Sequence, residues 1–167
     1  MNSIKDITFM GLFVALLISA QYVLSFISGI EIVTVLLLCY CFVFGSIRGM
    51  IVATVFSLVR CLVFGFNPNV IVLYLIYYNL FALFFGFIGK KTDSLSIITL
   101  CSVVFTTFFT FLDDLITPFI LGFNMKATVT YMFSSLYTLI PHMLCTFVTV
   151  ILLFKPLSRV MRKYIDG

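Results

Sequence analysis

Residues 95–121 read LSIITLCSVVFTTFFTFLDDLITPFIL, an apolar stretch whose charged side chains are Asp113 and Asp114. A transmembrane helix needs about 20 predominantly apolar residues, so this stretch is long enough to cross a bilayer. The rest of the chain has the same character, because 63% of its 167 residues are hydrophobic, 10% are charged and the mean hydropathy is +1.26. A soluble domain is about 45–50% apolar and about 25% charged. The sequence therefore predicts an integral membrane protein.

Turn-forming and polar residues interrupt the apolar pattern at five places and divide the chain into six segments. The predicted spans are residues 7–28, 31–45, 49–66, 70–89, 95–121 and 128–154. The first is longer than the roughly 7–15 apolar residues of a signal peptide, so it is interpreted as a span. The second is short, and we expect it to be tilted little or only partly embedded. The predicted fold class is an all-α bundle of six transmembrane helices in a single domain, residues 1–167.

The positions of the basic residues predict how the bundle is oriented, since Lys and Arg in short loops are retained on the cytoplasmic side. With the N-terminus inside, Lys126 falls in an outer loop and Arg60 lies within the third span. The other basic residues all fall inside: Lys5, Arg48, Lys90, Lys91, Lys155, Arg159, Arg162 and Lys163. This asymmetry predicts an even number of crossings, with both termini cytoplasmic, in the cell membrane.

Several function classes have no support in the sequence. No basic run is interleaved with aromatic residues, so nucleic acid is not expected as a partner. The five cysteines lie in apolar stretches, without a C-x-x-C pair or a His at ligand spacing, and we interpret them as small hydrophobic residues. We therefore predict no metal, no cofactor and no catalytic residue.

Charged side chains inside spans are the strongest functional signal, because each costs about 2.5–3.5 kcal/mol or more at membrane depth. Arg60 precedes the outer end of the third span by six residues, and Asp113 and Asp114 precede Leu121 by eight and seven. At 1.5 Å per residue, all three lie about 9–12 Å below the outer boundary. We expect Arg60 to form an ion pair with one aspartate. A structural ion pair explains only one carboxylate, so a functional cavity and a structural clasp both stay open.

Two spans also carry polar stripes at helical spacing. The stripe on the fifth span consists of Thr99, Ser102, Thr106, Thr110, Asp113 and Thr117, and that on the sixth consists of Tyr131, Ser135, Thr138, His142, Thr146 and Thr149. Steps of three or four residues place each set on one helical face. We expect both faces to point inward, across a shared cavity or in hydrogen bonds within the bundle.

Aromatic and amide side chains gather in the outer half of the fourth span. They are Tyr74, Tyr77, Tyr78 and Asn79, with Asn67 and Asn69 in the preceding loop. The tyrosines fit either an interfacial belt or the lining of a site for a flat, partly aromatic ligand.

Small residues follow one another at four-residue spacing on the first span, at Gly11, Ala15 and Ser19. Such a strip allows close approach of another helix.

Taken together, these features resemble the substrate-binding S component of an energy-coupling factor (ECF) vitamin transporter. The resemblance rests on six spans, on the first-span strip, and on GSIRG at residues 45–49, FGFNP at residues 64–68 and GFIGK at residues 86–90, in that order. It implies a complex with a transmembrane T component and two cytoplasmic ATPases, in which this chain captures a micronutrient from outside. The strip of Gly11, Ala15 and Ser19 would contact the T component.

The resemblance also implies a ligand site in the outer half, lined by the last three spans and the outer loops. Its expected residues are Arg60, Asn67, Tyr74, Tyr78, Asn79, Thr110, Asp113, Asp114, Thr117, Tyr131, Thr138 and His142. A polar heteroaromatic vitamin and a cationic compound fit this set equally. Two other functions stay open: an intramembrane enzyme using Asp113, Asp114 and His142 as acid and base groups, and a ligand-free structural subunit.

Overall fold

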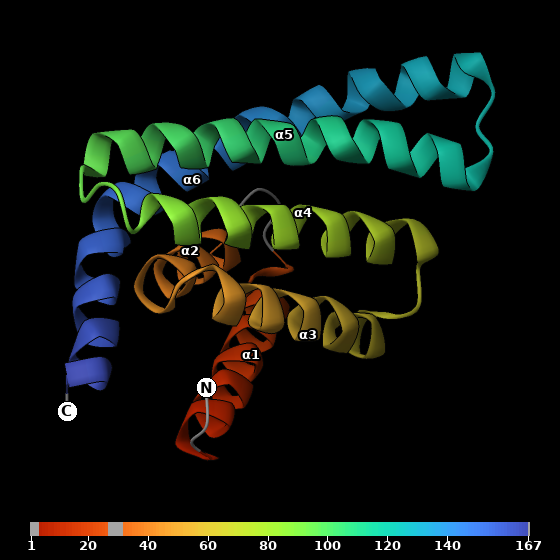
Figure 1. The fold of residues 1–167 in the computed structure, drawn as a ribbon. Helices are drawn as coiled ribbons and strands as arrows, with labels where there is room; N and C mark the ends of the chain where they lie inside the picture. Colours follow the sequence, from red (N-terminus) through yellow and green to blue (C-terminus); the bar gives the residue numbers. More distant parts are fainter. Residues whose placement is uncertain (1–3, 27–31, 167) are drawn as a thin grey trace.

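A computed structural model describes residues 4–26 and 32–166 (Figure 1). These residues form six helices and no strand, which confirms the all-helical fold. The helices are α1 (Ile4–Leu24), α2 (Val33–Phe44), α3 (Ser46–Phe64), α4 (Pro68–Ile88), α5 (Leu95–Leu121) and α6 (Met125–Asp166). The predicted end of the first span at residue 28 and the predicted start of the second at residue 31 lie outside the described residues.

Five of the helices, α1 and α3 to α6, are long and apolar enough to cross a membrane. The exception is α2, whose 12 residues extend only about 18 Å at 1.5 Å per residue, against a hydrocarbon core of about 30 Å. Its residues from Val33 to Phe42 are all buried by neighbouring helices. The short second segment is therefore a core helix, smaller than the predicted span over residues 31–45.

The long helices form two antiparallel hairpins. One consists of α3 and α4, and the other of α5 and α6, whose link contains Gly122 in the left-handed region at φ 66°. In Figure 1, α4 lies between α3 and α5, while α6 lies against α5 and α2. The helix α1 leans across α3, and the ion pair from Arg48 to Asp6 at 3.1 Å ties its first turn to the start of α3.

Glycines allow close helix contact at the end of the bundle where α2 meets α3. A Cβ on Gly49 would lie 2.6 Å from Sγ of Cys41, and one on Gly89 would lie 2.6 Å from the carbonyl oxygen of Phe42. A Cβ on Gly86 would overlap the backbone of Ser46. The motifs GSIRG and GFIGK therefore meet in space as one tightly packed contact.

The last helix is longer than the predicted span over residues 128–154, because it continues as a helix through the basic C-terminal segment to Asp166. Figure 1 shows that this segment turns away from the direction of α5 and runs along the end of the bundle. Pro156 lies at the start of this segment, where it removes a backbone donor and favours a bend. Phe154, Ser158 and Met161 are buried along one face of it.

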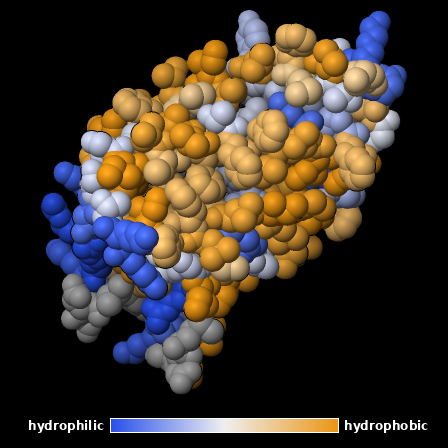
Figure 2. Space-filling view, turned by 45° about the horizontal axis from the view of Figure 1, so that its top comes forward, coloured by the Kyte–Doolittle hydropathy of each residue, from blue (hydrophilic) through white to orange (hydrophobic). Residues whose placement is uncertain are grey.

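The outer surface has the polarity of a membrane protein. Figure 2 shows a broad apolar surface, with hydrophilic residues gathered at the ends and most densely at one of them. Large exposed apolar side chains are distributed over the long helices, including Leu62, Leu100 and Phe119. An apolar girdle between polar ends supports a multi-pass membrane protein.

Candidate functional site

Asp113 is the centre of a hydrogen-bond network that joins three helices. Its Oδ1 accepts a hydrogen bond from Thr117 at 2.6 Å, and its Oδ2 accepts one from the hydroxyl of Tyr131 at 2.7 Å. The amide of Asn69, near the start of α4, donates to Oγ1 of Thr117 at 3.1 Å. We call these four residues the aspartate network. It brings the predicted residues Asp113, Thr117 and Tyr131 together in one place.

Asp114 has a different environment from its neighbour. Its Oδ2 accepts a hydrogen bond from Ser135 of α6 at 2.9 Å, whereas its Oδ1 is buried and has no hydrogen-bond partner among the described residues. A buried carboxylate oxygen without a donor is costly and calls for an explanation, such as a bound group that supplies the donor. Asp114 therefore keeps one acceptor oxygen that no described side chain satisfies.

Arg60 does not pair with either aspartate, so the expected ion pair is wrong for the structure as described. Its guanidinium lies over the ring of Tyr74 at 4.3 Å and near the ring of Phe64 at 5.1 Å. The charges lie on helices that are not neighbours. The helix α3 packs against α1, α2 and α4, whereas α5 packs against α4 and α6, so α4 separates Arg60 from the aspartates. Stacking on aromatic faces partly compensates the cation, but Nε of Arg60 is buried without a hydrogen bond.

The tyrosines of α4 lie inside the bundle, so the interfacial-belt interpretation is wrong for them. Tyr74 and Tyr78 are buried and stack at 5.1 Å, with Phe56 of α3 edge-on to Tyr78 at 5.4 Å. Gln21 of α1 donates to the hydroxyl of Tyr74 at 3.2 Å. These rings lie between Arg60 and α5, where Tyr74 meets Phe109 edge-on at 5.8 Å.

The other predicted site residues do not converge as closely. Thr110 is buried on the same face of α5 as Asp113, but Asn79 binds Thr54 of α3 at 3.1 Å, away from α5. Asn67 is exposed at the start of α4. Thr138 is exposed and donates to the carbonyl oxygen of Ser135, and His142 is half-buried further along α6.

The polar stripes meet in the middle of the α5 and α6 hairpin, but at Thr138 the α6 stripe is exposed and does not point inward as expected. Oγ1 of Thr106 lies 2.9 Å from Oγ1 of Thr146, and both side chains are buried. Ser102 and Thr106 also donate to carbonyl oxygens of their own helix. In this region the stripes act as a contact between the two helices.

A pocket of about 460 Å³ lies beside the network at the α5 and α6 turn. It is lined by Phe123, Asn124, Lys126, Ala127, Thr130, Tyr131 and Ser134. Its volume is in the range of about 300–1,000 Å³ that is typical of small-molecule sites. Tyr131 connects the two features, because its ring lines the pocket while its hydroxyl contacts Asp113.

Two contacting residues were not among the predicted site residues: Asn69 of the aspartate network, and Ser135, which donates to Asp114. The periodicity of α6 already placed Ser135 on the polar face, one turn from Tyr131, so that signal was present in the sequence. In the sequence, Asn69 stands out together with Asn67 before the fourth span, but its contact with Thr117 depends on how α4 packs against α5, which the sequence does not give.

The strip of Gly11, Ala15 and Ser19 lies on the exposed face of α1. The opposite face carries Phe13 and Leu17, both of which are buried. A Cβ on Gly11 would meet nothing within 4 Å. The strip therefore does not pack against residues 4–26 or 32–166 and is accessible to another helix.

Comparisons with protein-family models, with curated proteins and with solved structures found no match to this chain.

Proposed function

We propose that this chain is the substrate-capture S component of an ECF-type importer, which binds a vitamin or related micronutrient from outside and performs no chemistry. The ligand would pass to a transmembrane T component driven by two separate ATPase subunits. The proposed orientation has both termini in the cytoplasm, because the eight basic residues other than Arg60 and Lys126 belong to the helix ends and links on one side of the bundle.

The observation that carries this proposal is a pair of aspartates, Asp113 and Asp114, that form no ion pair with any basic residue in the described part of the chain. Asp113 has both oxygens engaged by hydroxyl groups, whereas Asp114 keeps a buried oxygen without a donor. Because Arg60 is engaged with aromatic rings, it neutralises neither carboxylate. A cationic or donor-rich ligand would offset the cost of these acids, so we favour the cationic class over the neutral heteroaromatic one.

The surroundings of the aspartates also suit such a ligand. The pocket lined by Tyr131 is about 460 Å³, which is large enough for a vitamin-sized molecule. The exposed strip on α1 provides a surface for the T component, far in sequence from the ligand residues.

A ligand-free structural subunit is the second candidate, and one observation favours it. Both oxygens of Asp113 are already satisfied within the chain, as in a helix clasp. The two candidates differ at Asp114, which a clasp does not require.

The experiment is ligand detection in gently purified protein, followed by binding measurements in nanodiscs. Mass spectrometry of the wild-type protein should detect a copurified micronutrient. Thiamine serves as a cationic heteroaromatic probe and riboflavin as a neutral one. Asp114→Asn should lower the copurified amount, whereas the same substitution at Asp93, in the link between α4 and α5, should not. No bound molecule under any growth condition, together with a wild-type yield of folded Asp114→Asn, would favour the structural subunit.

A further inference from the structure

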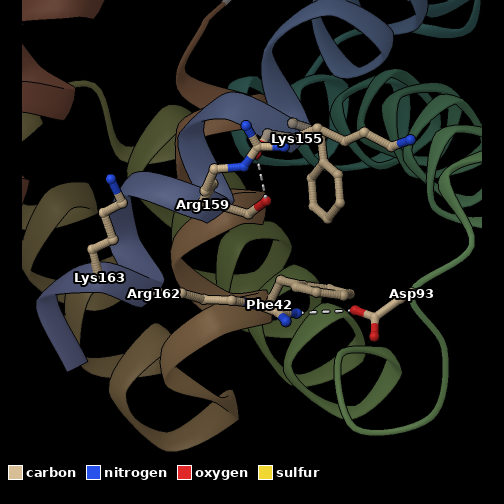
Figure 3. A pocket seen from close by; sticks show the side chains of 8 residues that line it. Phe42, Asp93, Lys155, Arg159, Arg162 and Lys163 are labelled. Carbon is tan, nitrogen blue, oxygen red and sulfur yellow. Dashed lines mark hydrogen bonds and ion pairs between the residues drawn. The ribbon is translucent and has the colours of Figure 1, made fainter. Parts of the chain in front are cut away.

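A second pocket, of about 370 Å³, lies at the opposite end of α6 from the aspartate network (Figure 3). It lies between the end of α2, the link before α5 and the C-terminal segment of α6. Its lining residues are Phe42, Asp93, Phe154, Lys155, Ser158, Arg159, Arg162 and Lys163. Four basic side chains and a single acidic one give this pocket a net charge of +3, since four minus one is three.

Most of that positive charge is not compensated within the described part of the chain. Arg162 donates to Asp93 at 2.9 Å and lies 5.7 Å from the ring of Phe42. Lys155, Arg159 and Lys163 form no ion pair with any described residue. In Figure 3, Arg162 and Asp93 lie on one side of the pocket, with Lys155 and Arg159 across from them. The arrangement attracts an anion, and the guanidinium of Arg159 is suited to a phosphate.

The floor of the pocket is packed, so the helical segment that carries the basic residues is held in place. Phe42 of α2 and Phe154 of α6 are buried and meet edge to face at 5.0 Å. Ser158 is also buried, one turn after Phe154 on the same face. This packing anchors the C-terminal segment on α2 and directs its basic face outward, as in a helix that lies at a membrane interface.

An apolar groove of about 490 Å³ runs between α5 and α6. It is lined by Leu95, Ser96, Thr99, Leu100, Val103, Phe147 and Ile151. Ile151 precedes Lys155 by one helical turn, and Leu95 follows Asp93 by two residues. From the basic pocket the groove therefore leads toward the middle of the apolar belt.

We propose that the basic pocket and the groove together bind one anionic phospholipid. The phosphate would contact Lys155 and Arg159, and an acyl chain would occupy the groove beside Val103. A free phosphate would use only the basic pocket, and an acidic protein surface would leave the groove unused. The combination of cations at a polar end and an apolar groove continuing into the bilayer favours a lipid, and basic pockets between transmembrane helices on the cytoplasmic side are known to hold such headgroups. This site is separate from the proposed capture site.

The test is retention of phosphatidylglycerol, compared with phosphatidylcholine of the same chains, by native mass spectrometry of the full chain. The wild type should retain phosphatidylglycerol preferentially. The double variant Lys155→Gln, Arg159→Gln should bind it about 30-fold more weakly, from the loss of two cations near the surface. Lys90→Gln, Lys91→Gln is the matched control, because it removes two cations in the α4 and α5 link that do not line the pocket. It should leave retention unchanged.

The groove is tested separately by Val103→Trp, which should reduce retention of phosphatidylglycerol. The same variant should still bind inorganic phosphate in the basic pocket as the wild type does. Equal retention of both lipids by the wild type would overturn the proposal. So would full retention by Val103→Trp combined with displacement by millimolar phosphate, which would indicate a free-phosphate site. Loss of ATPase association in the double variant, with lipid retention intact, would overturn it in favour of a protein partner.

Discussion

The hydroxyl of Tyr131 donates a hydrogen bond to Oδ2 of Asp113 across 2.7 Å and so ties α6 to α5 near the turn that joins them. Because Thr117 occupies the other oxygen and is itself bonded to Asn69, the same carboxylate also connects α5 to α4. A charge that would be costly in hydrocarbon is thus used to fix the relative positions of three helices.

Removal of the Tyr131 hydroxyl should weaken this connection. In Tyr131→Phe, Oδ2 of Asp113 loses its donor, and we expect a loss of about 1–3 kcal/mol in the free energy of unfolding. Thermal unfolding in detergent measures this loss. Tyr137→Phe is the matched control, because Tyr137 is 89% exposed on the same helix. Equal stability of the two variants would show that the hydrogen bond does not hold the hairpin.

The two aspartates should separate stability from ligand capture. Asp113→Asn removes a charged acceptor that two hydroxyl groups satisfy, so the folded state should lose stability. Asp114→Asn removes an acid with an unsatisfied oxygen, so stability should be retained or should rise while ligand binding falls. Unfolding midpoints and copurified ligand, measured on both variants, check this division. A ligand loss confined to Asp113→Asn would contradict it.

Arg60 should be energetically coupled to Tyr74 and not to Asp113. The guanidinium lies 4.3 Å from the Tyr74 ring, and such a contact contributes about 0.5–2 kcal/mol. A double-mutant cycle with Arg60→Gln and Tyr74→Leu should give a coupling energy in that range. The cycle with Arg60→Gln and Asp113→Asn should give a value near zero. A large coupling in the second cycle would mean that the ion pair predicted from depth forms in the membrane.

The contrast between the predicted ion pair and the observed stacking of Arg60 on Tyr74 shows which features the sequence can predict. Hydropathy and turn residues locate the helices, because the cost of burying polar groups in lipid acts along the chain. Depth also follows from residue counting, and it puts Arg60 and Asp113 at the same level. Which helices are neighbours does not follow, since it depends on packing between distant segments, and here α4 separates the two charges.

Packing between distant segments also explains other differences between prediction and structure. The sequence pattern of a tyrosine in the outer half of a span is the same whether its ring faces the lipid headgroups or the core. Only tertiary packing, here that of Phe56 against Tyr78, distinguishes the two positions. The span predicted over residues 128–154 is shorter than α6, because the apolar run ends at Phe154 whereas the helix continues to Asp166. The polar face of α5 is predictable from the sequence, since its polar residues recur with the period of an α-helix.

Gly86 and Gly11 should respond oppositely to alanine. In Gly86→Ala the new Cβ would overlap the backbone of Ser46, which cannot move aside as a side chain can, so we expect a loss of about 1–3 kcal/mol from overpacking. In Gly11→Ala the Cβ meets nothing within 4 Å, and the helix gains about 0.5–1 kcal/mol from the residue's higher helical preference. Unfolding midpoints of the two variants provide the measurement. Similar effects of both substitutions would mean that the contact between α4 and the start of α3 is looser than described.

The strip on α1 should matter for assembly and not for folding. Ala15 is exposed, and the residues that hold α1 to the bundle, such as Leu17, lie on its other face. Ala15→Leu should therefore leave the unfolding midpoint and the copurified ligand unchanged while preventing a partner helix from approaching closely. Coexpression with the T component and ATPases of the same organism, followed by affinity capture, measures the association. Thr107→Leu, an equally exposed change on α5, is the control and should assemble normally. If both variants assemble like the wild type, the T component docks elsewhere, and a destabilised Ala15→Leu would mean that the strip packs within this chain after all.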